Sequence, residues 1–220
     1  MAGVGFYGKL PMRGDFLGRG LGPDFIQPWD GWLQGVLQAG QDGLQQGWLG
    51  HYLNSPIWHY VLAAGLCGPD AMVGVMIASV DTVGRYFPLT VAASLVGRPV
   101  PALVMPSVLD WCRTAETVAL SALEPEHGFD AFEAAVADLA LPAVAGAEIG
   151  LAPAVTAIEG EVAPALLRLA VEPGSGGSLW WTDGTPEIPG VGLRADGMPT
   201  PQQAVALFDG QWERWGWIRR

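Results

Sequence analysis

The sequence predicts an α/β (α+β) fold, in the form of a three-layer α/β/α domain with a mostly antiparallel central sheet. Three apolar runs, residues 56–64, 71–80 and 86–96, are separated only by residues 65–70 and 81–85. Connections of this length are too short for a helical crossover, so consecutive runs should pair antiparallel. The runs are almost continuously apolar rather than alternating, which indicates that helices cover both faces of the sheet.

Helices are predicted where apolar residues recur at steps of three and four. This pattern is found in residues 24–44, 107–123 and 128–139. Asp24 can cap the first of these helices, with Gln27 as the returning partner of a capping box. A short helix over residues 200–208 should begin at Thr200, with Gln203 completing the box.

Strand composition is found in residues 4–10 and again in residues 178–182. Residues 140–165 are rich in Ala, Pro and Gly, which predicts an extended connection or a variable insertion. The tail 211–220 (QWERWGWIRR) contains three Trp and three Arg. It either packs back on the domain or offers an aromatic and basic segment to a partner. We predict one domain over residues 1–210 that is followed by this tail.

The chain carries 11 basic and 22 acidic residues over 220 positions, a net charge of −11. An acidic surface repels phosphate backbones, which argues against nucleic acid and anionic membranes as partners. No apolar run reaches the roughly 20 residues of a transmembrane helix. Lys9 and Arg13 interrupt a weakly apolar start, which is not typical of a signal peptide. We therefore expect a cytoplasmic protein without membrane insertion.

Signatures of common enzymes and metal sites are missing from the sequence. It has no GxxxxGK[ST] loop, no GxGxxG after a strand, no GxSxG and no HExxH. Cys67 and Cys112 lie far apart without a second pair of thiols, which favours two buried apolar residues over a disulfide scaffold or zinc knuckle. His59 flanks an aromatic-rich strand, which favours a core or interface role over ligation. We predict no metal and no cofactor.

Two polar clusters stand at predicted strand ends in this charge-poor chain. Lys9, Arg13 and Asp15 follow the first strand, and Asp81 and Arg85 lie in the turn between two buried strands. This grouping predicts a shared polar site. Three interpretations remain open: a structural network of ion pairs, a partner-recognition surface, and a phosphate-binding or metal-assisted catalytic site.

Aromatic residues form a second candidate set, consisting of Trp29, Trp32, Trp48 and Trp58. They could form an exposed docking patch. Aromatic residues at helical spacing more often belong to the core.

Several short motifs occur in an order that resembles one known family. They are GFYGKLPMRGDF (5–16), PWDGWL (28–33), SPIW (55–58), SVDTVGRYFPL (79–89) and SLWW (178–181). Together they resemble the TagF family, also called ImpM, whose members are accessory proteins of bacterial type VI secretion systems. The motifs span most of the chain and are densest in residues 4–97. No family motif is found in residues 140–165 or in the tail.

The resemblance implies a cytoplasmic regulator with a longin-like fold rather than an enzyme. Members of the family repress type VI secretion after translation by binding another protein, and the implied partner is the forkhead-associated scaffold protein of the system. The residues that match the family's motifs, without an assigned role, are Lys9, Arg13, Asp15, Trp29, Asp30, Trp32, Asp81, Gly84 and Arg85. Two alternatives remain: a phosphate-binding or hydrolytic enzyme using Asp15, Asp81 and Arg85, and a structural subunit of the secretion apparatus.

Overall fold

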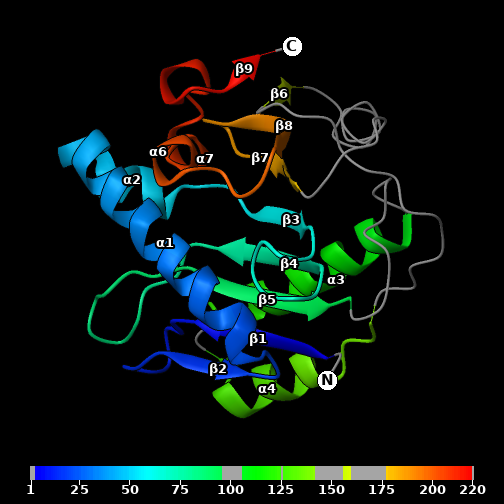
Figure 1. Ribbon diagram of the computed structural model, residues 1–220. Helices are drawn as coiled ribbons and strands as arrows, with labels where there is room; N and C mark the ends of the chain where they lie inside the picture. Colours follow the sequence, from blue (N-terminus) through cyan, green and yellow to red (C-terminus); the bar gives the residue numbers. More distant parts are fainter. Residues whose placement is uncertain (1–2, 96–105, 125, 142–155, 160–176, 220) are drawn as a thin grey trace.

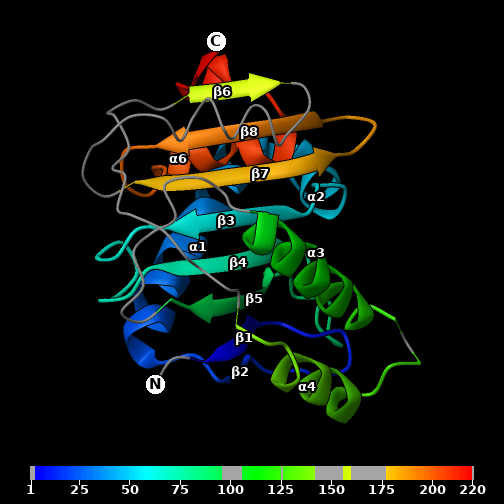
Figure 2. The same cartoon turned by 90° about the vertical axis from the view of Figure 1, so that its right-hand side faces the viewer.

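The computed structural model describes residues 3–95, 106–124, 126–141, 156–159 and 177–219. Within these residues the strands are β1 (Val4–Gly8), β2 (Leu17–Arg19), β3 (Trp58–Leu62), β4 (Met72–Ile77), β5 (Leu89–Ser94), β6 (Thr156–Glu159), β7 (Ser178–Gly184), β8 (Pro189–Ala195) and β9 (Ile218–Arg219). They form a single sheet of nine described strands in the order β2-β1-β5-β4-β3-β7-β8-β6-β9 (Figures 1 and 2). Every pair is antiparallel except β6 and β9, which run parallel.

Helices cover both faces of the sheet (Figures 1 and 2). The α-helices among the described residues are α1 (Pro23–Leu44), α2 (Trp48–Leu53), α3 (Pro106–Ser121), α4 (Phe129–Ala137), α6 (Pro201–Ala204) and α7 (Ala206–Asp209). One face packs against α1, α2, α6 and α7, and the other against α3 and α4. These three layers and the antiparallel pairing confirm the fold class predicted from the sequence.

The central strands are buried on both sides, which explains their continuous apolar runs. In β3, Tyr60 and Leu62 belong to the core under α1, whereas Val61 belongs to the core under α3. Gly74 of β4 lies opposite Tyr60, and a Cβ atom at Gly74 would stand 2.3 Å from the Tyr60 hydroxyl oxygen. A glycine is therefore needed where the tyrosine ring crosses the neighbouring strand.

Some elements differ from the sequence-based expectations. Helix α1 begins at Pro23 with Gly22 at the N-cap and no side-chain cap, so the predicted Asp24 cap is wrong. Pro23 accounts for this start, because a proline at the first helical position has the required φ and lacks an N–H that would need a partner. The box formed by Thr200 and Gln203 is confirmed at the start of α6.

Strands β2, β6, β8 and β9 and helix α2 were not predicted. β8 has the sequence PGVGLRA, whose glycines and proline hide its strand character. Strand β6 comes from the Ala-, Pro- and Gly-rich residues 140–165, most of which lie outside the described residues.

The tail packs against the domain. Trp212 and Trp217 are buried, and the indole N–H of Trp217 donates to the Gln203 carbonyl oxygen at 2.8 Å. The tail also forms a 3-10 helix, η2 (Glu213–Trp215), and strand β9 beside β6. The sequence left open whether this segment packs on the domain or is offered to a partner, and in the structure it packs on the domain.

Candidate functional site: a charged cluster at the ends of β1 and β4

The topology brings the two predicted polar clusters together. Strands β1 and β4 are both antiparallel to β5, which lies between them, so their C-terminal ends meet at the same edge of the sheet. Lys9 follows β1, and Asp81 follows β4 after a short connection. The two predicted clusters therefore lie together, joined by Lys9 and Asp81, which are 72 positions apart in the sequence.

Asp81 is at the centre of this site. One of its carboxylate oxygens, Oδ2, accepts from Lys9 Nζ at 2.5 Å and from Arg85 Nε at 2.8 Å. The Asp81 side chain has no exposed surface, and that of Lys9 is 4% exposed, whereas that of Arg85 is 56% exposed. The Lys9–Asp81 pair is thus a buried ion pair, and Arg85 extends from it to the surface.

The same carboxylate fixes the loop between β4 and β5. Its second oxygen, Oδ1, accepts the backbone N–H of Val83 at 3.0 Å and that of Arg85 at 2.9 Å. The Asp81 backbone N–H donates to the Arg85 carbonyl oxygen at 2.9 Å. Gly84 has a φ of +84°, which a glycine adopts without strain. Gly84 is thus a turn residue, and Asp81 orders the loop that it begins.

These bonds explain the low pKa of Asp81. Burial acts to raise the pKa of the carboxyl group, but the hydrogen bonds from Lys9, Arg85 and Val83 outweigh burial and hold the pKa well below its ordinary value of 3.8. The carboxylate is therefore ionised at neutral pH. All of its described partners are internal donors.

The loop after β1 lies directly against the loop after β4. The Thr82 backbone N–H donates to the Arg13 carbonyl oxygen at 3.3 Å, and Arg85 Nη2 donates to the Gly14 carbonyl oxygen. The Arg13 guanidinium stacks on the Phe129 ring of α4 with 4.7 Å between them. Asp15 is exposed, and its side chain has no hydrogen bond or ion pair with any described residue. Asp81 and Arg85 are therefore paired with each other, whereas Asp15 lies on the neighbouring loop and takes no part in their ion pairs.

Phe16 is a member of the site that the sequence reasoning missed. Its ring lies 4.5 Å from Lys9 Nζ and packs edge-on against Phe87 at 4.8 Å between ring centroids. It also stacks with Tyr7, yet 46% of its surface remains exposed. Phe16 follows Asp15 directly in the motif RGDF, and this position next to the charged residues could have indicated that it belongs to the site.

The motif residues on α1 have structural positions. Trp29 is fully buried, and its indole N–H donates to Thr90 Oγ1 at 3.0 Å. Asp30 accepts from the Tyr7 hydroxyl at 2.6 Å. Burial and the Asp30 carboxylate together raise the pKa of Tyr7. The Trp32 indole N–H donates to the Pro199 carbonyl oxygen at 2.7 Å.

Trp29, Asp30 and Trp32 therefore belong to the packing of α1 rather than to the charged cluster. Trp48 and Trp58 are also buried. The core interpretation of the predicted aromatic set is thus the one that the structure supports.

The remaining candidate nucleophiles are buried. Cys67 and Cys112 are both free and buried, and burial raises the pKa of Cys67 to about 11 and also raises that of Cys112. Their thiols are protonated at neutral pH. His59 is buried with its Nε2 atom 2.6 Å from Glu116 Oε2, in agreement with a core position.

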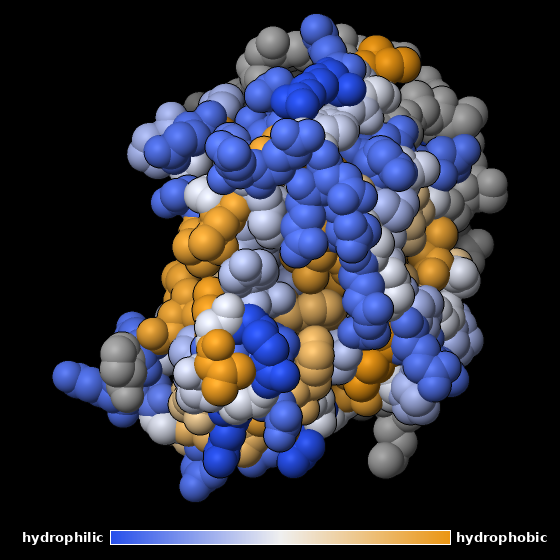
Figure 3. All heavy atoms as spheres, turned by 90° about the vertical axis from the view of Figure 1, so that its left-hand side faces the viewer, coloured by the Kyte–Doolittle hydropathy of each residue, from blue (hydrophilic) through white to orange (hydrophobic). Residues whose placement is uncertain are grey.

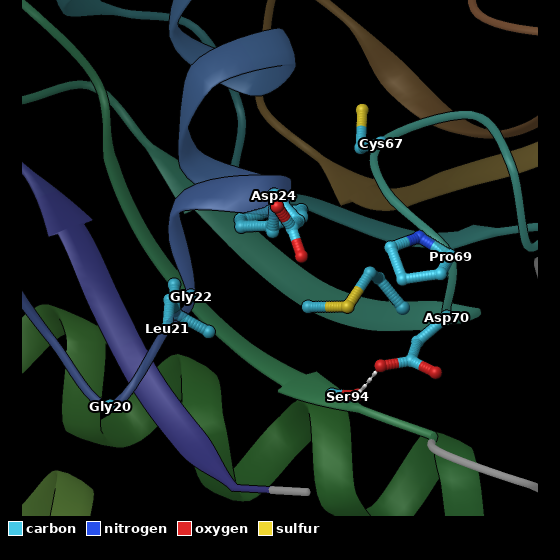
Figure 4. A pocket seen from close by; sticks show the side chains of 10 residues that line it. Gly20, Leu21, Gly22, Asp24, Cys67, Pro69, Asp70 and Ser94 are labelled. Carbon is cyan, nitrogen blue, oxygen red and sulfur yellow. Dashed lines mark hydrogen bonds between the residues drawn. The ribbon is translucent and has the colours of Figure 1, made fainter. Parts of the chain in front are cut away.

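A separate cavity of about 110 Å³ lies at the opposite end of β4 (Figure 4). Asp70, which precedes β4, lines it together with Asp24 and Cys67, and Ser94 donates to Asp70 at 3.1 Å. Asp81 follows β4, so this cavity is not part of the charged cluster.

Among the described residues, no three His, Cys, Asp or Glu side chains are grouped so as to hold a metal ion. The described parts of the chain also contain no helix with both the length and the apolar composition needed to cross a membrane.

The fold and the site define a class of α/β/α domain in which an internal ion-pair cluster fixes the loops at one edge of an antiparallel sheet. Residues 5–139 match the family model of the TagF N-terminal domain, described as type VI secretion system-associated. The chain belongs to this family and is therefore a type VI secretion system-associated protein.

A solved structure supports the same fold. The chain is similar to PA0076 from Pseudomonas aeruginosa PAO1, with 36% sequence identity, a TM-score of 0.77 and 94% of each chain covered. A search of curated proteins found no match.

Proposed function

We propose that this protein is a cytoplasmic accessory regulator that represses type VI secretion after translation by binding a component of the secretion system. The proposed partner is the forkhead-associated scaffold protein. Family membership supports the association with the secretion system. The observation that carries the binding role is the state of Asp81, whose carboxylate is occupied by internal donors and orders a surface loop.

The full set of internal hydrogen bonds on the Asp81 carboxylate favours a binding role over a hydrolytic one. A catalytic carboxylate must reach a reacting atom or its proton at about 3 Å. Asp81 has no exposed side-chain surface, and each of its oxygens already accepts two hydrogen bonds. The cluster therefore suits the presentation of a rigid protein surface.

The proposal is tested by co-purification and by a secretion assay. Tagged protein should form a stoichiometric complex with the forkhead-associated protein of the same system, and overexpression should reduce the release of type VI substrates into the medium. The protein should remain in the soluble fraction when assembled secretion particles are sedimented. The absence of a complex together with unchanged secretion would refute the proposal, and co-sedimentation with the particles would instead indicate a structural subunit.

A further inference from the structure

Exposed apolar side chains lie on the two loops of the charged cluster and on helix α2, which contacts one of these loops. Of the seven large hydrophobic residues exposed in the described part of the chain, four lie on segments that contact one another: Phe16, Leu49, Leu53 and Val83. Val83 is 67% exposed, the highest value in this group. We name the surface formed by these four residues, Arg13 and Arg85 the strand-end face.

Contacts between the three segments hold the strand-end face together. The loop after β1 is bonded to the loop after β4 through Thr82 and Arg85, as described above. Helix α2 is attached to the start of the second loop, because the Tyr52 hydroxyl donates to the Ser79 carbonyl oxygen at 2.9 Å and accepts from the Ser79 N–H at 3.0 Å. The Tyr52 ring also lies 5.7 Å from that of Tyr86. Figure 1 places these three segments on one side of the molecule, and Figure 3 shows hydrophobic and strongly hydrophilic side chains side by side there.

The local charge differs in sign from that of the whole chain. Residues 9–16 and 81–86 contain three basic residues, Lys9, Arg13 and Arg85, against two acidic ones, Asp15 and Asp81, so 3 − 2 = +1. The chain as a whole carries −11. Lys9 offsets the charge of Asp81 in the buried pair, so that Arg13 and Arg85, whose side chains are exposed, leave positive charge at the surface.

The backbone of the loop that carries Val83 is also held in place, because Asp81 accepts the N–H groups of Val83 and Arg85. An apolar side chain on a fixed loop loses little conformational entropy when a partner covers it. Exposed apolar side chains bordered by charged residues are typical of protein interaction sites.

From these observations we infer that the strand-end face binds a segment of the partner protein in which a carboxylate side chain lies next to an apolar one. The apolar side chain contacts Val83 and Phe16, and the carboxylate pairs with Arg13 or Arg85. This inference rests on the proposed function, since it assigns the surface and the chemistry through which the regulator binds its partner.

The test uses Val83→Glu and Ile218→Glu as matched variants of the full-length protein. Both residues are exposed, at 67% and 55%, so neither substitution disturbs the core, and Ile218 lies on β9 outside the strand-end face. Binding is measured by titration calorimetry with the purified forkhead-associated protein as the probe. Thermal unfolding of each variant checks that the fold is retained.

We expect Val83→Glu to weaken binding at least about tenfold, because it places a charge in the apolar contact and opposes the partner's carboxylate. Ile218→Glu should stay within about twofold of wild type. Arg13→Gln should weaken binding as well and should reduce its dependence on salt, since a screened charge pair is lost.

The outcomes separate the two proposals. If the wild-type protein binds and Val83→Glu binds equally well, the strand-end face is not the contact surface, while the proposed function stands. If only Ile218→Glu loses binding, the tail is the contact and the inference is overturned. If the wild-type protein itself does not bind the probe, the proposed function fails and this inference fails with it.

Discussion

Lys9→Met should destabilise the protein far more than Arg85→Ala, although both residues pair with the same carboxylate. Lys9 is 4% exposed, and the Asp81 side chain that it faces is fully buried. Removing one member of a buried ion pair typically costs about 3–5 kcal/mol, because it leaves a buried charge with too few partners.

The structure indicates that the cost of Lys9→Met in stability lies at the lower end of this range. Methionine keeps the apolar stem of lysine, and three donors remain on the Asp81 carboxylate: the N–H groups of Val83 and Arg85 and the guanidinium of Arg85. We therefore expect a loss of about 3 kcal/mol in the free energy of unfolding. For a domain of this size, the melting temperature should fall by about 6–12 °C.

Arg85→Ala removes a side chain that is 56% exposed. Water screens its pairing with Asp81, so the expected loss is about 1 kcal/mol or less. Arg113→Ala serves as a surface control, because Arg113 pairs with Asp110 at 3.3 Å and both side chains are largely exposed.

Urea titration at neutral pH measures the free energy of unfolding of the three variants, and calorimetry measures their melting temperatures. The reasoning is refuted if Lys9→Met lies within about 1 kcal/mol of wild type, or if Arg85→Ala costs more than Lys9→Met.

Three further predictions concern the acid dependence of Asp81, the packing of the core and the tail. Because the pKa of Asp81 in the folded protein lies below its ordinary value of 3.8, its contribution to stability is complete above that pH and is lost as the pH falls toward the folded pKa. In urea titrations, the free energy of unfolding should therefore fall less steeply with acid for Asp81→Asn than for wild type. Equal slopes would contradict this prediction. Gly74→Ala should cost about 1–3 kcal/mol by overpacking, because its Cβ would meet the buried Tyr60 ring, and an unchanged melting temperature would show that this contact is relieved at no cost. Trp217→Ala should cost about 3–5 kcal/mol as a buried aromatic deletion, and a protein as stable as wild type would indicate that the tail does not pack on the core in solution.

The central part of the fold could be predicted because its sequence pattern is strong. Short connections between continuous apolar runs determine the β3-β4-β5 meander and the need for helices on both faces, and the structure confirms both. Strands such as β2 and β8 could not be predicted in the same way. They are short or rich in glycine, and they are strands because neighbouring strands pair with them, which local composition does not reveal.

The charged cluster shows the same limit at the level of single residues. The sequence predicts that scarce charges at two strand ends form one site, and the structure brings them together. Lys9 and Arg85 look equivalent in sequence, because each is a basic residue near the end of an apolar run. Their burial differs in the structure, since the Lys9 side chain is 4% exposed and that of Arg85, which lies in the loop after β4, is 56% exposed. Burial of this kind depends on contacts 72 positions apart, which no local pattern contains.

This difference in burial decides how mutations in the cluster should be interpreted. Asp81 is a positioning residue in the proposed binding, since it fixes the loop that carries Val83 and has no exposed side-chain surface of its own. An Asp81 or Lys9 variant that loses binding would therefore also lose stability, and the loss would not identify a contact. Val83 and Arg13 are exposed, so their substitutions can remove a contact while the fold stays intact. If the contact surface lies at this edge of the sheet, substitutions of Val83 and Arg13 should weaken binding without lowering stability. Substitutions of Asp81 and Lys9 should lower both.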